Sequence, residues 1–136
     1  MDRSRLISEA QQAATRSYAP YSNFHVGAAL LAEDGTIFQG ANVENRSYGL
    51  SICAERSAVF RAISEGAKRF VAIAIHCPDA DYPVSPCGAC RQVLSEFMPP
   101  EAPVIFTAGN GAEQETTIAG LLPFDALHEL KDAGRG

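Results

Sequence analysis

The first third of the chain has the polar and apolar pattern of a helix followed by a β-hairpin. Residues 3–17 carry apolar side chains at helical spacing, and a Tyr-Ala-Pro-Tyr-Ser-Asn stretch at residues 18–23 ends this pattern. Residues 24–32 are mainly apolar and predict a strand. Asp34-Gly35 is a hairpin turn signal, so residues 36–40 are expected to form the returning strand.

The remaining pattern alternates helices with short apolar strands. The expected elements are a helix at 53–65, a strand at 70–75, a helix at 88–97, a strand at 103–107, a strand at 116–118 and a helix at 124–131. The two central strands are continuous apolar runs, which is typical of strands buried on both faces. The order α-β-β-α-β-α-β-β-α predicts an α/β fold in which helices cover both faces of a mixed five-stranded sheet.

The composition fits one soluble domain and indicates which partners are unsuitable. The chain has 136 residues, so residues 1–136 are expected to form a single domain. Its charged fraction of 20% is slightly low, which leaves room for a buried interface between subunits. The 11 basic and 16 acidic residues give a net charge of −5, and no basic cluster stands out. A nucleic-acid backbone is therefore disfavoured as the main partner, and no nucleic acid is expected in the site.

The expected location is the cytoplasm, with no membrane partner. The N-terminus leads into an amphipathic stretch and lacks the apolar core of a signal peptide. No run reaches the roughly 18 apolar residues that a membrane span needs. The 4 cysteines are clustered, which in a cytosolic chain more often indicates metal or redox chemistry than disulfides.

Two short motifs together supply the parts of a zinc site. They are Cys-Ala-Glu-Arg at residues 53–56 and Pro-Cys-Gly-Ala-Cys-Arg-Gln at residues 86–92. Three thiols, from Cys53, Cys87 and Cys90, would leave a fourth coordination position for water, whereas four protein ligands usually make a closed structural site. This pattern favours a catalytic zinc ion and a hydrolytic reaction.

The spacing also predicts how the site is built. Cys87 and Cys90 are three residues apart at a predicted helix start, so their side chains share a face, and helix N-termini favour thiolates. Residues two apart on a helix point about 200° apart, so Cys53 and Glu55 converge only if Cys53 precedes the helix. Glu55 would then move the protons of the water and the substrate.

The adjacent arginines are candidates for charge compensation. Zinc with three thiolates carries a formal charge of about −1, which weakens it as a Lewis acid. Arg56 and Arg91 lie next to the motifs and are expected to offset part of this charge, together with the two helix ends.

Other interpretations of the cysteines and histidines remain open. Cys77 would complete a closed site with four cysteine ligands, although a free Cys at the end of a buried strand is usually a small hydrophobe. The Cys-Gly-Ala-Cys run also resembles a thioredoxin-type redox motif, but it occurs late in the chain, after a helix that carries a third Cys. His25, His76 and His128 have no metal-like spacing; His25 is expected on the solvent face of a strand.

The motif pair resembles the signature of the small zinc-dependent cytidine deaminases, whose zinc is held by Cys₃ or His/Cys/Cys ligands beside a Glu. The similarity extends along most of the chain, through Tyr-Ser-Asn-Phe (21–24), Val-Gly-Ala-Ala-Leu (26–30), Asn-Val-Glu-Asn (42–45) and Leu-Leu-Pro (121–123). The Cys₃ version is similar to the homotetrameric free-nucleoside enzymes. It implies a three-layer α/β/α fold, Zn²⁺, and hydrolysis of cytidine and 2′-deoxycytidine to the uridines and ammonia, as in pyrimidine salvage. It also implies a homotetramer with shared active sites.

The same resemblance implies roles for further residues. It implies that Asn42 and Glu44 bind a sugar hydroxyl and that Phe24 packs on the pyrimidine ring. It also implies that the Ala54 backbone N–H binds the base carbonyl, and that Tyr48 and Phe124 contribute to a site shared between subunits. From the residues alone, an amide and a carboxylate two apart on an extended segment point the same way and can share a hydroxyl. A solvated polar loop would otherwise be the simpler interpretation. The family's aromatic lies a few residues beyond Leu-Leu-Pro, whereas Phe124 follows Pro123 directly, so the register differs.

Three other functions are weighed against this one. The shifted Phe124 leaves open a relative that acts on a modified cytosine nucleoside, such as a blasticidin-type antibiotic. A non-catalytic zinc scaffold is disfavoured by Glu55 and by the missing fourth ligand. Editing of RNA or DNA is disfavoured by the acidity of the chain.

Overall fold

The N-terminal segment forms the expected helix, α1 (Arg3–Ala14), in the computed structural model of the chain, which describes residues 1–131. The Asp2 side chain accepts a hydrogen bond from the Arg5 backbone N–H at 3.0 Å and so caps one unpaired donor of the first turn. The buried face of the helix consists of Leu6, Ala10, Ala13 and Ala14. These mostly small side chains allow α1 to lie close against the sheet.

The next two elements, β1 (Gly27–Ala32) and β2 (Ile37–Ala41), form the expected antiparallel hairpin. Gly35 in the connecting turn has a φ of 93°, a left-handed conformation that glycine adopts without steric cost. β1 begins three residues later than predicted. The strand pairing starts at Gly27, and the backbone N–H groups of residues 24–26 donate to side chains instead.

The second part of the chain continues the alternation of helices and strands. In order, its elements are α2 (Ala54–Ser64), β3 (Phe70–Cys77), α3 (Gly88–Phe97), β4 (Pro103–Ala108), β5 (Glu113–Thr117) and α4 (Ile118–Leu121). Two short 3₁₀ turns, Tyr48–Leu50 and His128–Leu130, lie in loops. β3 and β4 are buried along nearly their whole length, as their continuous apolar runs predict.

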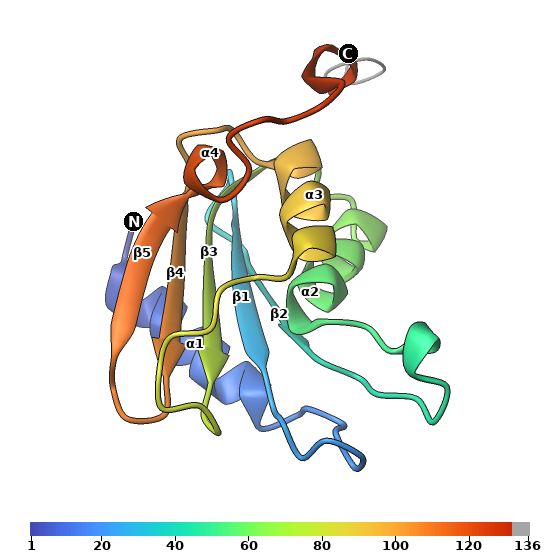
Figure 1. Cartoon of the computed structure of the whole chain (residues 1–136). Helices are drawn as coiled ribbons and strands as arrows, with labels where there is room; N and C mark the ends of the chain where they lie inside the picture. Colours follow the sequence, from blue (N-terminus) through green and yellow to red (C-terminus); the bar gives the residue numbers. More distant parts are fainter. Residues whose placement is uncertain (132–136) are drawn as a thin grey trace.

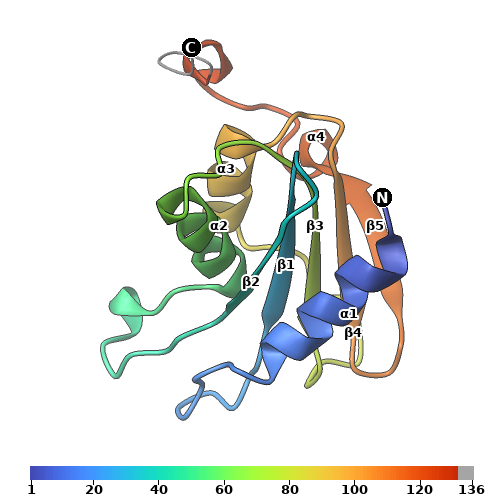
Figure 2. The same cartoon turned by 180° about the vertical axis from the view of Figure 1, so that it is seen from behind.

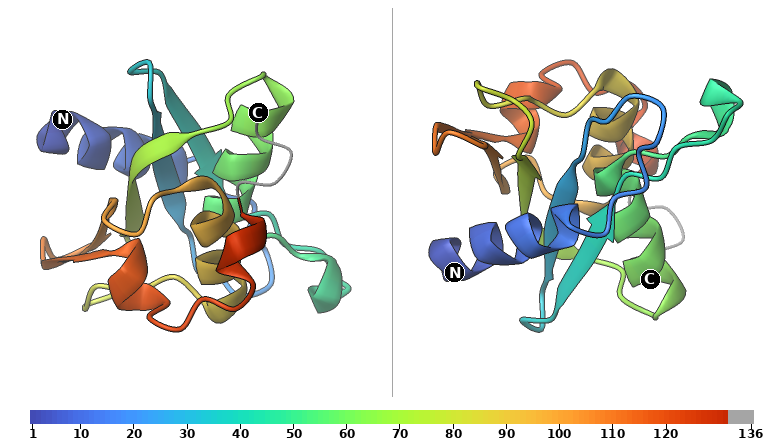
Figure 3. Two further views of the ribbon diagram at one scale, coloured as in Figure 1. Left: turned by 90° about the horizontal axis from the view of Figure 1, so that it is seen from above. Right: turned by 90° about the horizontal axis from the view of Figure 1, so that it is seen from below.

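The strands form one mixed sheet with the order β2-β1-β3-β4-β5. β3 and β4 run parallel, and the other neighbours are antiparallel. α2 and α3 cover one face of the sheet (Figure 1), and α1 crosses the opposite face, as the view from behind shows (Figure 2). The views along the strands show the same three layers (Figure 3). The predicted three-layer architecture is confirmed.

Each side of the sheet has its own hydrophobic core. The larger core lies beneath α2 and α3 and includes Val59, Leu94 and Phe106. The smaller one lies beneath α1 and is built around Leu6 and Ile105. Burial of these apolar side chains is the main contribution to stability, and it also fixes where the first residues of α2 and α3 lie.

The C-terminal third differs from the sequence prediction. β5 covers Glu113–Thr117 rather than 116–118, and a short helix, α4, follows at once because the Thr117 side chain accepts from the Gly120 N–H at 3.0 Å. The terminal helix predicted at 124–131 is wrong: this segment contains only a 3₁₀ turn, preceded by Leu127 in a left-handed conformation. Within residues 1–131, no helix combines the length and the apolar character needed to cross a membrane.

Candidate active site

The three predicted zinc ligands come from the first residues of two helices on the same face of the sheet. Cys53 directly precedes α2 and Cys87 directly precedes α3; both have extended backbone conformations, and Cys90 lies in the first turn of α3. The helix begins one residue later than the predicted 53–65, so Cys53 meets the condition for converging with Glu55 and the 200° conflict does not arise. Both helix N-termini direct partial positive charge at the thiols.

The sulfur atoms have the spacing that a tetrahedral zinc ion requires. The Sγ atoms of Cys53 and Cys87 are 3.9 Å apart, and all three sulfurs lie within 4.8 Å of one another. Zinc–sulfur bonds of about 2.3 Å with tetrahedral angles place sulfurs ~3.8 Å apart. Among the described residues, these three cysteines are the one group of three or more His, Cys, Asp or Glu side chains whose ligand atoms lie this close together. The donor set fits zinc.

Cys77 lies outside this sulfur cluster. It is buried at the end of β3, where burial, followed by the charge of Glu55, raises the pKa of its thiol to about 12. Its sulfur is not among the three that lie within 4.8 Å of one another, so Cys77 is not placed to act as a fourth ligand. His76, the second-last residue of β3, has its Nδ1 2.7 Å from the Thr107 hydroxyl and does not belong to the group of possible metal ligands.

Arg56 contacts the thiols directly. Its Nη2 donates to the Cys53 sulfur at 3.3 Å. Hydrogen bonding from Cys90 and then from Arg56 lowers the pKa of Cys53 to about 5, against the effect of burial. The same contact raises the pKa of Arg56 above its usual value, so the guanidinium stays charged. A fixed positive charge beside the ligands is what the sequence predicts for Arg56.

Arg91 is placed differently. Its guanidinium donates to the carbonyl oxygens of Pro86 at 2.8 Å and Leu121 at 3.1 Å, and to the Ser85 hydroxyl at 3.1 Å. These bonds brace the segment that leads into Cys87 against the end of α4. The contribution of Arg91 to the charge of the site stays a prediction.

Glu55 is the second residue of α2 and is 5% exposed. Burial raises the pKa of its carboxyl to about 7, and the charge of Cys53 adds to this effect. A carboxyl in this range can both take up and return a proton near neutral pH. Desolvation therefore gives Glu55 the character of a proton carrier.

A cavity of about 490 Å³ opens over the thiols and Glu55. It is lined by Phe24, Val26, Asn42, Glu44, Tyr48, Ser51, Ile52, Cys53, Ala54, Glu55, Arg56, Ile75, Cys77, Val84, Ser85 and Cys87. A larger hollow of about 620 Å³, which includes Arg69, Phe97 and Lys131, contains none of the predicted site residues. The chemistry of the thiols and of Glu55 identifies the smaller cavity as the candidate active site.

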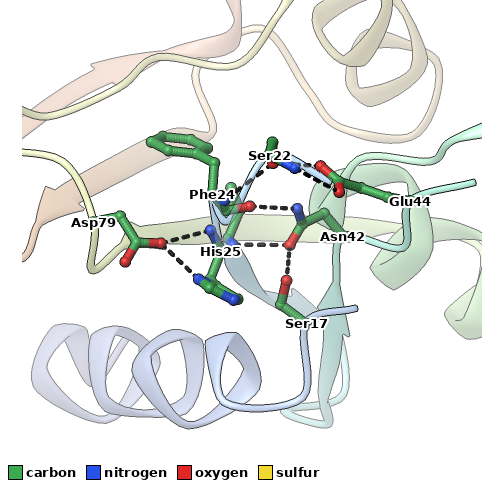
Figure 4. A network of polar contacts seen from close by, with 8 residues as sticks. Ser17, Ser22, Phe24, His25, Asn42, Glu44 and Asp79 are labelled. Carbon is green, nitrogen blue, oxygen red and sulfur yellow. Dashed lines mark hydrogen bonds and ion pairs between the residues drawn. The ribbon is translucent and has the colours of Figure 1, made fainter. Parts of the chain in front are cut away.

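Asn42 and Glu44 lie on the wall of this cavity and hold the loop before β1 (Figure 4). The Asn42 amide N–H donates to the Phe24 carbonyl at 2.8 Å, and its oxygen accepts from the Val26 N–H and the Ser17 hydroxyl. Glu44 accepts from the backbone N–H groups of Tyr21 and Ser22 and from the Ser22 hydroxyl. Each side chain thus performs a structural task as well as facing the cavity.

The structure brings most of the predicted substrate residues together, with one exception. Phe24, Ala54 and Tyr48 line the cavity, and the Tyr48 ring meets Tyr21 edge-on with ring centroids 6.2 Å apart. Phe124 is 93% exposed and lies outside the cavity of its own chain. Any contact of Phe124 with a substrate would need a second subunit.

Sequence reasoning missed several residues of the site. Ile52, Val84 and Ser85 line the cavity from loops, and the hydroxyl of Ser22 links Glu44 to the Phe24 backbone. Ile52 and Val84 have no sequence signal because isolated apolar residues in loops are common. Ser22 could have been noted as a turn-forming Ser beside an aromatic residue.

The comparison with known families agrees with this geometry. The family model for the cytidine and deoxycytidylate deaminase zinc-binding region matches residues 1–117. The chain belongs to this family. The matched region contains Cys53, Cys87 and Cys90, and these three cysteines hold zinc in this chain.

Individual relatives are similar over nearly the whole chain. A cytidine deaminase from Sporosarcina psychrophila is 53% identical over 123 residues, which are 90% of each chain. The crystal structure of a cytidine deaminase from Burkholderia pseudomallei superimposes with a TM-score of 0.87 at 47% identity, covering 91% of this chain and 98% of that one. A blasticidin-S deaminase from Bacillus cereus is 32% identical over 125 residues, 87% of each chain.

Proposed function

We propose that the protein is a zinc-dependent cytidine deaminase that converts cytidine and 2′-deoxycytidine, with water, into the corresponding uridines and ammonia, as in pyrimidine salvage. The observation that carries this proposal is a buried carboxyl, Glu55, beside three zinc thiolates at the base of one cavity. The cavity volume of about 490 Å³ is in the range of small-molecule sites, which run from about 300 to 1,000 Å³.

Glu55 carries the proton transfers in this proposal. When bound, zinc supplies a Lewis acid that lowers the pKa of water. The Glu55 carboxylate takes a proton from the attacking water and delivers it to N3 of the base as the new C4–O bond forms. It then takes the second proton of the former water from the new C4 hydroxyl and passes it to the C4 amino group, which leaves as ammonia when the C4–N bond breaks. Its burial keeps bulk water from competing for these protons.

The sugar would be held by the hydrogen-bonding capacity that Asn42 and Glu44 retain. The Asn42 amide donates one of its two N–H bonds to Phe24, which leaves one donor. Glu44 accepts three hydrogen bonds, and a carboxylate has about four acceptor positions. One donor and one acceptor two residues apart complement a single hydroxyl group.

The base would be held by Phe24 and by the start of α2. Phe24 is half-buried at the cavity wall, where an aromatic face can pack on a pyrimidine. The backbone N–H groups of the first turn of a helix have no partner within the helix, so the Ala54 N–H is available to a carbonyl oxygen. These contacts recognise a neutral nucleoside.

The test is the ultraviolet absorbance of cytidine over time with zinc-loaded protein, together with an ammonia assay. We expect loss of the cytosine band with one ammonia released per cytidine. Free cytosine should react much more slowly in the same assay, because it lacks the hydroxyl group that Asn42 and Glu44 bind. Turnover of blasticidin S without turnover of cytidine would contradict the proposal and favour the second substrate class, which the similarity to a blasticidin-S deaminase keeps relevant.

We also propose a homotetramer with shared active sites. Beside the cavity, Tyr48 is 68% exposed and Leu50 is 74% exposed, and Phe124 is 93% exposed elsewhere. Tyr48 and Leu50 belong to one short turn, and large apolar side chains that gather at a surface favour a protein interface. Light scattering coupled to gel filtration should give four times the chain mass of 14.5 kDa, and a monomer that deaminates cytidine at full rate would contradict shared sites.

A cytoplasmic location is proposed with this function. Zinc is held by three thiolates, and a reducing compartment keeps such thiols from forming disulfides. Fractionation of cells that produce the protein, followed by immunodetection, tests the location; recovery outside the cytoplasmic fraction would contradict it.

A further inference from the structure

The residues directly before β1 are held by side chains rather than by strand pairing. Asn23 turns the chain with a φ of 57°, and the Phe24 N–H then donates to the Ser22 hydroxyl at 3.0 Å. The Asn42 amide binds Phe24 and Val26 on either side, as described above. The remaining N–H of this segment, that of His25, donates to the Asp79 carboxylate at 2.7 Å (Figure 4).

Asp79 binds His25 twice. The same carboxylate oxygen, Oδ2, lies 2.7 Å from the His25 ring Nδ1 as well as from the His25 backbone nitrogen. Asn42 and Ser22 belong to the stretch of chain around β1 and β2, whereas Asp79 follows β3. Asp79 therefore ties the Phe24 segment to the loop between β3 and α3, which carries Val84, Ser85 and Cys87 of the cavity wall.

Asp79 is itself held in a braced turn. The Ala80 N–H donates to the Cys77 carbonyl at 3.2 Å, and the Gly109 N–H donates to the Ala80 carbonyl at 3.0 Å. Gly109 packs so closely that a Cβ atom there would come within 2.0 Å of the Pro78 carbonyl oxygen. A rigid support of this kind allows Asp79 to fix its partner in one position.

The pair acts from outside the cavity. Phe24 lines the cavity, but neither His25 nor Asp79 does, and both of their side chains are more than one third exposed, at 37% and 39%. A polar contact between two exposed side chains contributes little to global stability, even where both are charged. The pair is therefore placed to influence the position of Phe24 more than the stability of the fold.

We propose that Asp79 and His25 are positioning residues that hold Phe24 against the pyrimidine ring and thereby set the affinity for the substrate. This inference rests on the proposed function. In the absence of the pair, the segment from Phe24 to Val26 keeps its bonds to Ser22 and Asn42 but loses its link to the opposite wall. Substrate binding must then order Phe24, which weakens binding and leaves the proton transfers by Glu55 unchanged.

The experiment compares Asp79→Ala with the wild-type enzyme, both loaded with zinc. We expect KM for cytidine to rise by about three- to tenfold while kcat stays within about twofold, because ordering one side chain affects substrate and transition state alike. His25→Ala should have a smaller effect, since its backbone N–H still reaches Asp79. Asp79→Asn should restore part of the affinity through its amide oxygen. The variant that combines Asp79→Ala with His25→Ala should have the same KM as Asp79→Ala alone.

Asp81→Asn is the matched control. It removes a charge from the same loop, and the Asp81 backbone carbonyl, which accepts from the Asn110 side chain at 2.9 Å, is the same in both proteins. Its KM should equal that of the wild type. Hydrogen exchange of the peptide that contains residues 24–26 gives a readout without turnover: exchange should be faster in Asp79→Ala and unchanged in Asp81→Asn.

An unchanged KM and unchanged exchange in Asp79→Ala would overturn the inference. A fall in kcat together with lost zinc would also overturn it, because the pair would then support the metal site and not Phe24. A wild-type protein that does not deaminate cytidine would instead overturn the proposed function, in which case the exchange experiment alone decides whether the pair holds the segment.

Discussion

Replacing Glu55 with Gln is expected to lower kcat for cytidine by about 10²- to 10⁴-fold, the range that a positioned general acid–base contributes. Gln has nearly the same shape and remains a hydrogen-bonding group, but it cannot accept a proton from water and deliver it to the base. Glu55 is 5% exposed, so no solvent molecule can easily replace it. Steady-state rates and metal analysis on the same sample measure the effect.

Glu65→Gln is the control for this substitution. Glu65 directly follows the same helix, is exposed, and pairs with Arg61 at 3.0 Å, an interaction of little energetic weight at the surface. It should leave kcat unchanged. If Glu55→Gln kept its zinc and turned over cytidine at a near-normal rate, Glu55 would have no part in the proton transfers.

Replacing Cys87 with Ala is expected to weaken zinc binding by more than about 100-fold and to abolish turnover at ordinary zinc concentrations. Loss of a mere outer-shell partner costs about 10- to 100-fold in metal affinity, and Cys87 is a direct ligand. Cys87 is exposed, so the substitution leaves no cavity in the core and the apo-protein should still fold. Competition with a chelator measures the affinity, and circular dichroism reports the fold.

Cys77→Ala separates this effect from general cysteine loss. Cys77 is a largely buried residue of the cavity wall but lies outside the sulfur cluster, so this variant should retain one zinc per chain. Full zinc occupancy in Cys87→Ala, with loss in Cys77→Ala, would show that Cys77 is the ligand.

The layer architecture and the order of elements from α1 to β4 follow from the sequence because these elements have clear patterns of apolar residues. The helical spacing of Leu6 and Ala10 and the apolar run that starts at Phe70 are local signals that tertiary packing reinforces. The segment 124–131 also has a helical pattern, yet it has no sheet face to cover and forms only a 3₁₀ turn. An amphipathic pattern yields a helix mainly where its apolar face is buried.

The zinc ligands were predictable for a different reason. Three cysteines and a Glu in two short motifs restrict the chemistry to a small set of metal sites, and the spacing within each motif fits the start of a helix. Phe24 shows the limit of this reasoning, because an apolar run predicts a strand from residue 24. In the structure, the Asn42 side chain donates to the Phe24 carbonyl and Asp79 accepts from the next backbone N–H, in place of strand pairing. Those contacts join residues 18 and 54 positions apart, and no local pattern reports them.

The sequence by itself determined the ligand types, the general-base candidate and the helices and strands as far as β4, because these depend on residue chemistry and on short-range spacing. Only the tertiary structure decided that the starts of α2 and α3 lie side by side, with the sulfurs of Cys53 and Cys87 3.9 Å apart. It also decided that Glu55 is buried, which raises its pKa to about 7, and that Asp79 reaches His25. The thiol spacing and the burial of Glu55 arise from packing both helices on one face of the sheet, which brings distant segments together and excludes water from the space between them. The contact of Asp79 with His25 arises because the sheet places the ends of β1 and β3 side by side.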